Sequence, residues 1–167
     1  RDSLAGGDEH TLFAILNETA TTMGARLLRR WLHRPLRNQE TLRARHDAVE
    51  WCTTEQAFES VHEPLRGIGD VERILARVAL RSARPRDLAR LRDSLGLLPE
   101  LQAVLAPFLP ERFAVLRSAI GEFPDLHALL ETAVIETPPA VIRDGGVIRE
   151  GYDADLDELR AISENAG

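Results

Sequence analysis

Arginines are the residues with the most evident chemical potential in this sequence, and they gather in one stretch. Eight lie between residues 66 and 92 against three carboxylates, a local net charge of +5 in a chain whose net charge is −6. A cationic segment of this kind is typical of a surface that binds a polyanion. The candidates for contact with a DNA backbone or a neighbouring domain are Arg73, Arg77, Arg81, Arg84, Arg86, Arg90 and Arg92.

A structural role also explains these arginines. They can cover the outer face of an amphipathic helical hairpin, bury their aliphatic stems and pair with acidic residues. From residue 93 onward 14 acidic residues stand against five arginines, so partners of opposite charge are available. From Arg73 to Arg92 no aromatic residue or glycine is interleaved to stack bases, as in platforms that bind single strands. We therefore favour the structural role.

No other group of residues forms a recognisable catalytic or metal site. The five histidines are scattered and lack the spacing of metal ligands. Cys52 has no histidine placed to activate it, which indicates a structural thiol. Asp153, Asp155 and Asp157 have the spacing of calcium ligands, but the glycine that such a loop needs is missing. We predict no catalytic, cofactor-binding or metal-binding residue, and no enzyme activity for this chain.

Two glycine-containing pairs are candidate structural joints, Gly69–Asp70 and Gly145–Gly146. The second pair follows Asp144 and precedes a predicted strand, so it indicates a hairpin turn and not an anion-binding loop. Turning the chain is the simpler role for both pairs.

The composition excludes several classes of function. All 21 basic residues are arginine, which excludes a phosphate-loop lysine and a Schiff base within these residues. A single cysteine excludes an internal disulfide. No apolar run is long enough to span a bilayer, and no signal-peptide pattern opens the chain. We expect a soluble cytoplasmic protein with no membrane partner.

Apolar residues at helical spacing would position the arginines. Four of them follow at i, i+3, i+4 and i+7: Val71, Ile74, Leu75 and Val78. Pro85 suits the first position of a second helix, which carries a 3-4-3 series of Leu88, Leu91, Leu95 and Leu98. The short link near Ser82 to Arg84 predicts two helices that lie side by side.

The segments on either side of this hairpin also favour helices. Thr21 or Thr22 would cap a helix whose apolar side includes Trp31, which we expect to be buried in the core. Asn38 would cap the next helix, and Thr53 would begin a capping box for the one after it. The predicted inner face of the Asn38 helix consists of Leu42, His46 and Val49.

Near the C-terminal end the sequence pattern changes from helical spacing to short apolar runs around a turn. Residues 140–149 favour a small β-hairpin around Gly145–Gly146, and Asp153 would cap a final helix. The fold class predicted is therefore mainly α, a multi-helix bundle with one small β-hairpin near the C-terminus and the start of a long lever helix. At 167 residues, the chain 1–167 is expected to form a single helical domain.

Several blocks of the sequence resemble a known family. They are Thr22–Leu36 (TMGARLLRRWLHRPL), Gly69–Arg77 (GDVERILAR), Ala83–Leu88 (ARPRDL), and Asp144–Ile148 (DGGVI) with Gly151, Tyr152 and Leu156–Leu159 (LDEL). In this order and over nearly the whole chain, they resemble the core, or lever, domain of the MutS family of bacterial DNA mismatch-recognition proteins.

The resemblance implies a helical core that joins a mismatch-reading domain to an ATPase domain within a large dimeric protein. The family's Phe-x-Glu motif, phosphate-binding loop and DNA clamp are missing here, so no catalytic residue is carried over. ATP and Mg would bind elsewhere in such a protein. The implied partners are the remaining domains of its own chain, mismatched duplex DNA, a second copy as a homodimer, and a MutL-type protein.

We expect the chain to be a fragment, because Arg1 to His10 is loose and polar and a helix has just begun at the other end. The function expected is that of a connecting core domain that transmits conformational change between the DNA-binding and ATPase domains. The alternative is an autonomous arginine-rich helical module that binds nucleic acid, whose binding to duplex DNA would weaken steeply with salt.

Overall fold

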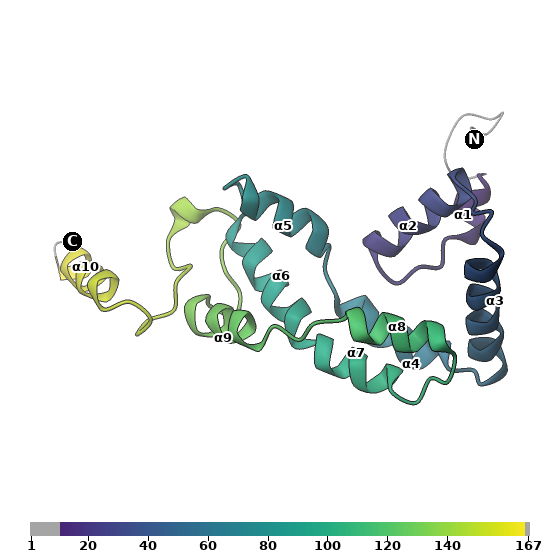
Figure 1. The fold of residues 1–167 in the computed structure, drawn as a ribbon. Helices are drawn as coiled ribbons and strands as arrows, with labels where there is room; N and C mark the ends of the chain where they lie inside the picture. The colour runs from purple at the N-terminus through teal and green to yellow at the C-terminus, as the bar shows by residue number, and fades with distance from the viewer. Residues whose placement is uncertain (1–10, 166–167) are drawn as a thin grey trace. The chain divides into compact units, whose positions relative to one another are not determined.

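The computed structural model describes residues 11–165, and this part of the chain is mainly α-helical (Figure 1). The predicted fold class is confirmed in that respect. Contacts between backbone segments divide the described chain into two compact units. Unit 1 comprises residues 11–72 and 97–122, and unit 2 comprises residues 73–96 and 123–165. The segment Arg1–His10, predicted to be loose, lies outside the described residues.

Unit 1 is built from six helices and the first residues of a seventh. The six are α1 (Leu12–Leu16), α2 (Thr22–His33), α3 (Gln39–Thr54), α4 (Phe58–Gly67), α7 (Leu98–Leu105) and α8 (Glu111–Ala119). Two helix starts follow the predicted caps. The Thr21 hydroxyl accepts from the Gly24 amide at 2.9 Å, and the Asn38 side chain accepts from the Thr41 amide at 2.7 Å.

The capping box predicted at Thr53 is wrong. Helix α3 continues through this position to Thr54, and the Thr53 hydroxyl donates to the Val49 carbonyl one turn earlier. Helix α4 begins at Phe58 without a side-chain cap. A threonine can bond back to the carbonyl four residues before it, so the same residue type fits a helix interior as well as a cap.

The core of unit 1 combines aliphatic and aromatic side chains. Its buried members are Ile68, Leu101, Leu105 and Phe108. The Phe108 ring lies 4.6 Å from Trp51 and 4.9 Å from Phe113, measured between ring centroids. Helix α4 packs against α7, and α8 packs against both α3 and α7. This arrangement places the aromatic cluster between α3 and α8.

Trp31 is not buried, and that prediction is wrong. Its side chain is 39% exposed, and the Arg45 guanidinium lies over its ring at 3.7 Å. The predicted inner face of α3 is also wrong, because His46 and Val49 are exposed while Trp51 packs against the core. Helical spacing groups residues on one face but does not determine which face a neighbouring helix covers.

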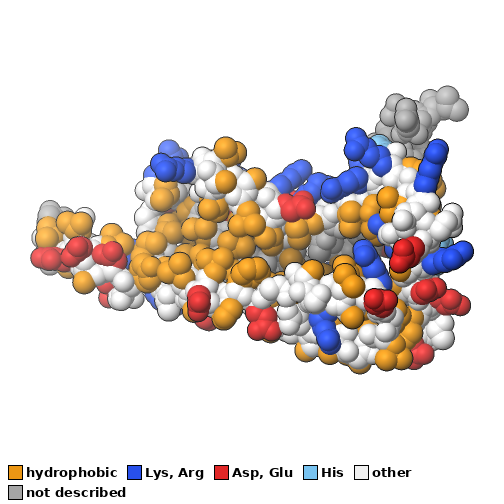
Figure 2. All heavy atoms as spheres, viewed as in Figure 1, with side chains coloured by type: hydrophobic (Ala, Val, Ile, Leu, Met, Phe, Trp, Pro, Cys, Tyr) orange, Lys and Arg blue, Asp and Glu red, His pale blue; other side chains and the backbone are white. Residues whose placement is uncertain are grey.

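Unit 2 contains most of α5 (Val71–Ala79), α6 (Pro85–Gly96), α9 (Pro124–Ala133) and α10 (Ala154–Asn165). Helix α6 packs chiefly against α9. The core of this unit consists of Ile74, Ala89, Leu91, Leu95, Leu130, Ala133, Val134 and Val147. Figure 2 shows further apolar side chains on the surface formed by α5, α6 and α9. The exposed apolar residues of these helices include Leu75, Val78 and Leu129.

The predicted helical hairpin is confirmed in its first arm and its turn, but its two arms do not pack closely along their length, because α6 packs chiefly against α9. Helix α6 begins at Pro85, as predicted, but it ends at Gly96. Leu98, which we assigned to the same arm, lies instead in α7 and in unit 1. A leucine series with constant spacing does not reveal a break between two consecutive helices.

The β-hairpin predicted over residues 140–149 is wrong. Ile142–Asp144 forms a 3₁₀ turn, and among the described residues the only β-type pairing is an isolated antiparallel bridge between Val134 and Ile148. The Arg149 amide donates to the Ala133 carbonyl at 2.8 Å. The apolar residues after Gly146 therefore pair with the segment that leaves α9, because that segment offers both backbone groups and an apolar core.

The final helix follows its predicted start. The Asp153 carboxylate accepts from the Leu156 amide at 2.9 Å and so caps α10. No helix within residues 11–165 combines the length and the apolarity that crossing a bilayer requires.

Candidate functional site

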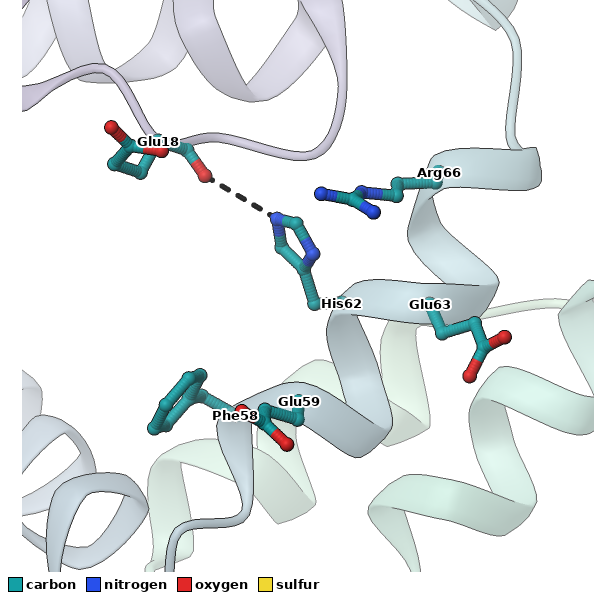
Figure 3. Close-up of a pocket in the computed structure, with 6 residues that line it drawn as sticks. All are labelled: Glu18, Phe58, Glu59, His62, Glu63 and Arg66. Atoms are coloured by element: carbon teal, nitrogen blue, oxygen red, sulfur yellow. Dashed lines mark hydrogen bonds between the residues drawn. The ribbon is translucent and has the colours of Figure 1, made fainter.

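A polar pocket in unit 1 is lined by one histidine and three glutamates (Figure 3). It is lined by Glu18, Phe58, Glu59, His62, Glu63 and Arg66. A ring nitrogen of His62 lies 3.4 Å from the Glu18 backbone carbonyl, while the carboxylates of Glu59 and Glu63 point away from the imidazole. Side chains that do not converge on one point do not form an acid–base or metal site.

Sequence patterns do not reveal this pocket, because Glu18 is distant from α4 along the chain. Across residues 11–165 there is no group of three His, Cys, Asp or Glu side chains that is placed to hold a metal ion. Cys52 lies half-buried on α3, and burial raises the pKa of its thiol. A raised pKa disfavours the thiolate, so Cys52 has the character of a structural residue.

All seven candidate arginines belong to unit 2, on α5, on α6 or on the turn between them. Arg77 on α5 makes a bidentate pair with Asp87 on α6, with nitrogen–oxygen distances of 2.6 and 2.7 Å. The same carboxylate accepts from the Arg84 backbone amide at 2.9 Å. The hydrogen bonds from Arg77 are the largest cause that lowers the pKa of Asp87. This pair joins the two arms of the hairpin.

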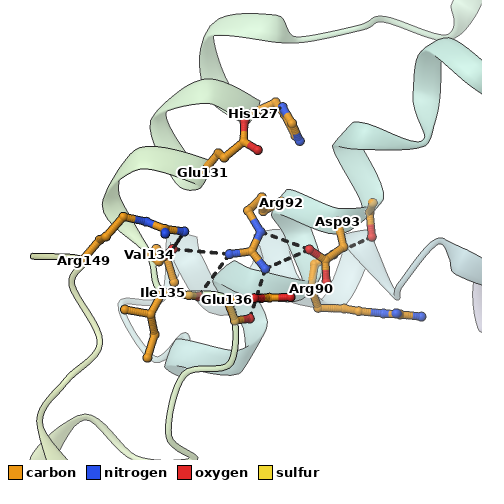
Figure 4. A network of polar contacts seen from close by, with 10 residues as sticks. Arg90, Arg92, Asp93, His127, Glu131, Val134, Ile135, Glu136 and Arg149 are labelled. Carbon is orange, nitrogen blue, oxygen red and sulfur yellow. Dashed lines mark hydrogen bonds and ion pairs between the residues drawn. The ribbon is translucent and has the colours of Figure 1, made fainter. Parts of the chain in front are cut away.

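Arg92 is buried, with 8% of its surface exposed, and it binds backbone carbonyls (Figure 4). Its guanidinium donates to the carbonyls of Val134 at 3.3 Å, Ile135 at 3.1 Å and Glu136 at 3.1 Å. It also pairs with Asp93 at 3.0 Å. These carbonyls directly follow the C-terminus of α9, where helices leave acceptors unsatisfied and favour a cation. Arg92 is therefore a structural residue and not part of an exposed cationic surface.

The remaining candidates stay on the surface. Those with exposed side chains are Arg73, Arg81, Arg84, Arg86 and Arg90. Arg86 donates to the Pro138 carbonyl at 3.4 Å. In the described part of the chain, the guanidinium groups of Arg81, Arg84 and Arg90 have no hydrogen-bond or ion-pair partner. Of the seven predicted arginines, Arg77 and Arg92 therefore make bonds within unit 2, and the other five have exposed side chains.

The first candidate joint, Gly69–Asp70, is tied to a helix distant in sequence. Arg26 on α2 binds both carboxylate oxygens of Asp70, at 2.6 and 2.7 Å, and the Glu72 carboxylate at 2.6 Å. These bonds raise the pKa of Arg26. Helical spacing within α2 gives no sign of this pairing, because Arg26 and Asp70 are 44 residues apart. A bidentate pair restricts motion at this position.

The second candidate joint, Gly145–Gly146, is exposed and lies in open space. Both residues have positive φ, +72° and +63°, and a Cβ atom at either position would meet nothing within 4 Å. Glycine is therefore required by the backbone conformation and not by lack of space. This geometry supports the simpler role of turning the chain.

The described residues thus form helices that are joined by arginine side chains and that leave apolar surface exposed. A comparison with family models gives a match to MutS domain III over residues 1–166, which is nearly the whole chain. The resemblance seen in the separate sequence blocks is thereby confirmed. The chain belongs to the MutS domain III family, the core domain of DNA mismatch repair proteins.

Proposed function

We propose that this core domain connects other parts of a mismatch-repair protein and passes conformational change between a DNA-binding part and an ATP-hydrolysing part. The match to MutS domain III over residues 1–166 is the observation that carries the proposal. A domain of this kind contributes through two arrangements that DNA and nucleotide favour differently, and not through a reaction of its own.

The division of the chain between the two units supports a mechanical role. The chain passes from one unit to the other after Glu72, Gly96 and Glu122. The first of these positions lies within α5, which runs from Val71 to Ala79. A helix is hydrogen-bonded along its axis, so it resists bending within its own length.

Exposed apolar side chains on unit 2 support contact with further protein. Leu75 and Val78 on α5 are 49% and 42% exposed, and Leu129 on α9 is 49% exposed. Figure 2 shows apolar side chains gathered over the same helices. Contiguous apolar surface of this kind is typical of an interface, and the remaining domains of the same protein are the partners proposed for it.

The other expectations from the family form part of this proposal. They are mismatched duplex DNA as a ligand, a homodimer as the assembly and a MutL-type protein as a partner. ATP and Mg belong to another part of the protein in this proposal. The residues present do not fit them, since the chain has no lysine for a phosphate loop and the described residues hold no metal-ligand group.

The test uses the intact protein and the variant Arg92→Lys. Lysine keeps the charge but lacks the planar fork of donors that reaches three carbonyls, so it loosens unit 2. The measurement is the affinity for a mismatched duplex with and without ATP. We expect the ATP-induced change in affinity to shrink by about fivefold or more, within the usual range of coupling between sites.

Arg143→Lys is the matched control, because Arg143 is 88% exposed and lies in the same unit. It should leave the coupling unchanged. Amide hydrogen exchange at residues 134–136 shows whether Arg92→Lys has loosened the unit. The proposed role would be contradicted if these amides exchanged faster in the variant while the effect of ATP on DNA affinity stayed the same.

A second candidate function is direct contact with the DNA backbone. The observation that favours it is the exposure of Arg81, Arg84 and Arg90, none of which has an ion-pair partner among the described residues. The double variant Arg81→Gln, Arg84→Gln should reduce the salt dependence of duplex binding by about one to two phosphate contacts. An unchanged salt dependence would rule out contact of these arginines with DNA, and the connecting role would be the only function proposed.

A further inference from the structure

An open apolar groove lies on unit 1 among α2, α3 and α8. Its volume is about 500 Å³. Leu27 on α2, Val49 on α3 and Leu116 on α8 contribute to its lining, and these three side chains are 41%, 66% and 42% exposed. A concave apolar surface that is exposed to water is the usual form of a binding site.

One wall of the groove has the pattern of a helix that packs against another helix. Arg45, Ala48, Val49 and Cys52 line it from α3 at i, i+3, i+4 and i+7. This stripe extends over about 10 Å at the helical rise per residue. Ridges formed by such residues receive the side chains of a neighbouring helix. The groove therefore has the shape to receive two turns of one further helix.

The charges of the groove select the chemistry of that helix. Arg45 and Arg112 are the charged residues in its lining, which contains no carboxylate. Within residues 11–165 neither guanidinium has an ion-pair partner. Arg45 lies over the Trp31 ring, and its Nε atom is buried without a hydrogen-bond partner. Because this Nε atom is buried, an incoming acceptor can reach only the terminal nitrogens of Arg45. A carboxylate is the strongest acceptor for a guanidinium.

We propose that this groove binds an amphipathic helix of a partner protein, whose apolar face fills the groove and whose acidic residues pair with Arg45 and Arg112. The apolar lining provides the contact area, and the two arginines provide the selection for an acidic partner. This interaction is distinct from the connecting role and does not depend on it.

The test measures binding of two synthetic helical peptides to the intact protein by fluorescence anisotropy. Each peptide has about 16 residues, or about four helical turns, with leucines along one face. The acidic peptide carries two glutamates beside the leucines, and the neutral peptide carries glutamines at the same positions. We expect the acidic peptide to bind about tenfold more tightly at low salt, and the difference to shrink as salt is added.

Variants locate the binding in the groove. Arg45→Gln should weaken the acidic peptide about tenfold and leave the neutral peptide nearly unchanged. Arg43→Gln is the matched control, because it makes the same charge change at an exposed position of α3 that does not line the groove. Val49→Glu places a like charge in the groove at an exposed position, so it should abolish binding of the acidic peptide without disturbing the core.

Cys52 provides an independent readout, because its side chain also lines the groove. The acidic peptide should slow the reaction of Cys52 with iodoacetamide, followed by mass spectrometry of the peptide that contains it. Equal affinity of both helical peptides, or an unchanged Cys52 reaction at saturating acidic peptide, would overturn the proposal. It would also be overturned if Cys52 and Trp31 in the intact protein were already protected without any peptide, since the groove would then be filled by the protein itself.

Discussion

Each of the two units is stabilised internally by a different kind of contact. In unit 1 the rings of Trp51, Phe108 and Phe113 pack against one another and form part of the apolar core or lie against it. In unit 2 arginine side chains bind backbone carbonyls. Arg92 binds the segment after α9, and Arg160 on α10 donates to the Ile148 carbonyl at 2.9 Å. Apart from the pair between Arg26 and Asp70, the first unit relies on burial of apolar surface, and the second adds hydrogen bonds from arginine to backbone carbonyls.

This difference follows from how much regular structure each unit contains. Apolar contact has no preferred direction, so it suits helices whose backbone groups are already paired. Residues 134–148 of unit 2 contain no long helix, and their backbone groups need partners from elsewhere. A guanidinium presents several donors in a plane and can satisfy consecutive carbonyls. In this unit arginine side chains thus supply the hydrogen-bond donors that regular secondary structure would otherwise provide.

The largest effect expected is on the apolar side of the comparison. Phe108→Ala removes a buried ring from the aromatic cluster and should lower the free energy of unfolding by about 3–5 kcal/mol. Urea unfolding followed by tryptophan fluorescence measures this loss. Leu109→Ala is the control, because Leu109 is the next residue and is 82% exposed. Similar losses for the two variants would show that the cluster is not the core of unit 1.

The polar side of the comparison predicts a slightly smaller effect. Arg92→Met keeps most of the side-chain volume but leaves three carbonyls without their donor, which should destabilise the protein by about 2–4 kcal/mol. The faster-exchanging amides should be those of residues 134–149. Arg90→Met on the exposed face of α6 serves as the control. A loss below about 0.5 kcal/mol for Arg92→Met would show that water replaces the guanidinium without penalty.

The starts of several helices could be predicted from the sequence, because a helix start depends on neighbouring residues. Thr21, Asn38 and Asp153 cap the helices predicted for them, and Pro85 begins α6. Each of these signals lies within three or four residues of the bond that it makes. Helix starts of this kind can therefore be predicted without knowledge of the fold.

The role of Trp31 could not be predicted from periodicity, and the pair Trp31 and Trp51 allows a direct test. Trp31→Ala should cost only about 1–2 kcal/mol, because its ring is partly exposed and packs under Arg45. Trp51→Ala should cost at least twice as much, since Trp51 contacts two other rings. Equal costs would mean that α2 is covered more fully than the structure indicates. Calorimetry and urea titration both measure the difference.

The arginine ties could not be predicted because their partners are far away in sequence. Arg26 and Asp70 are 44 residues apart, and Arg92 binds carbonyls that lie 42 to 44 residues later. Backbone carbonyls carry no residue type, so no pattern marks the three that Arg92 reaches. The failed hairpin at 140–149 has the same origin, because Ile148 pairs with Val134 and not with a neighbour across the turn.

The smallest effect expected is a dependence on pH. The pKa of Asp87 is lowered in the folded protein by Arg77, so the carboxylate stabilises the fold above its unfolded pKa of about 3.9. This contribution is lost as the pH falls below about 4, through the folded pKa. It amounts to about 1 kcal/mol, because Arg77 is partly exposed to solvent.

Asp87→Asn tests this prediction. The variant should be less stable than the parent protein at pH 7, and the difference should shrink as the pH approaches 3. Asp125→Asn, at an exposed position in the first turn of α9, provides the comparison. A difference that persists undiminished at low pH would show that the pair with Arg77 is not its source.

The turn at Gly145 has a consequence that concerns handedness. Its φ of +72° and ψ of −172° are the mirror image of the extended polyproline conformation, which is favourable for ordinary residues. A D-alanine introduced by peptide ligation would adopt this conformation without strain and would restrict the unfolded chain, whereas L-alanine would not. Open space surrounds the position, so the chirality of a single carbon, and not its bulk, decides whether the chain turns there.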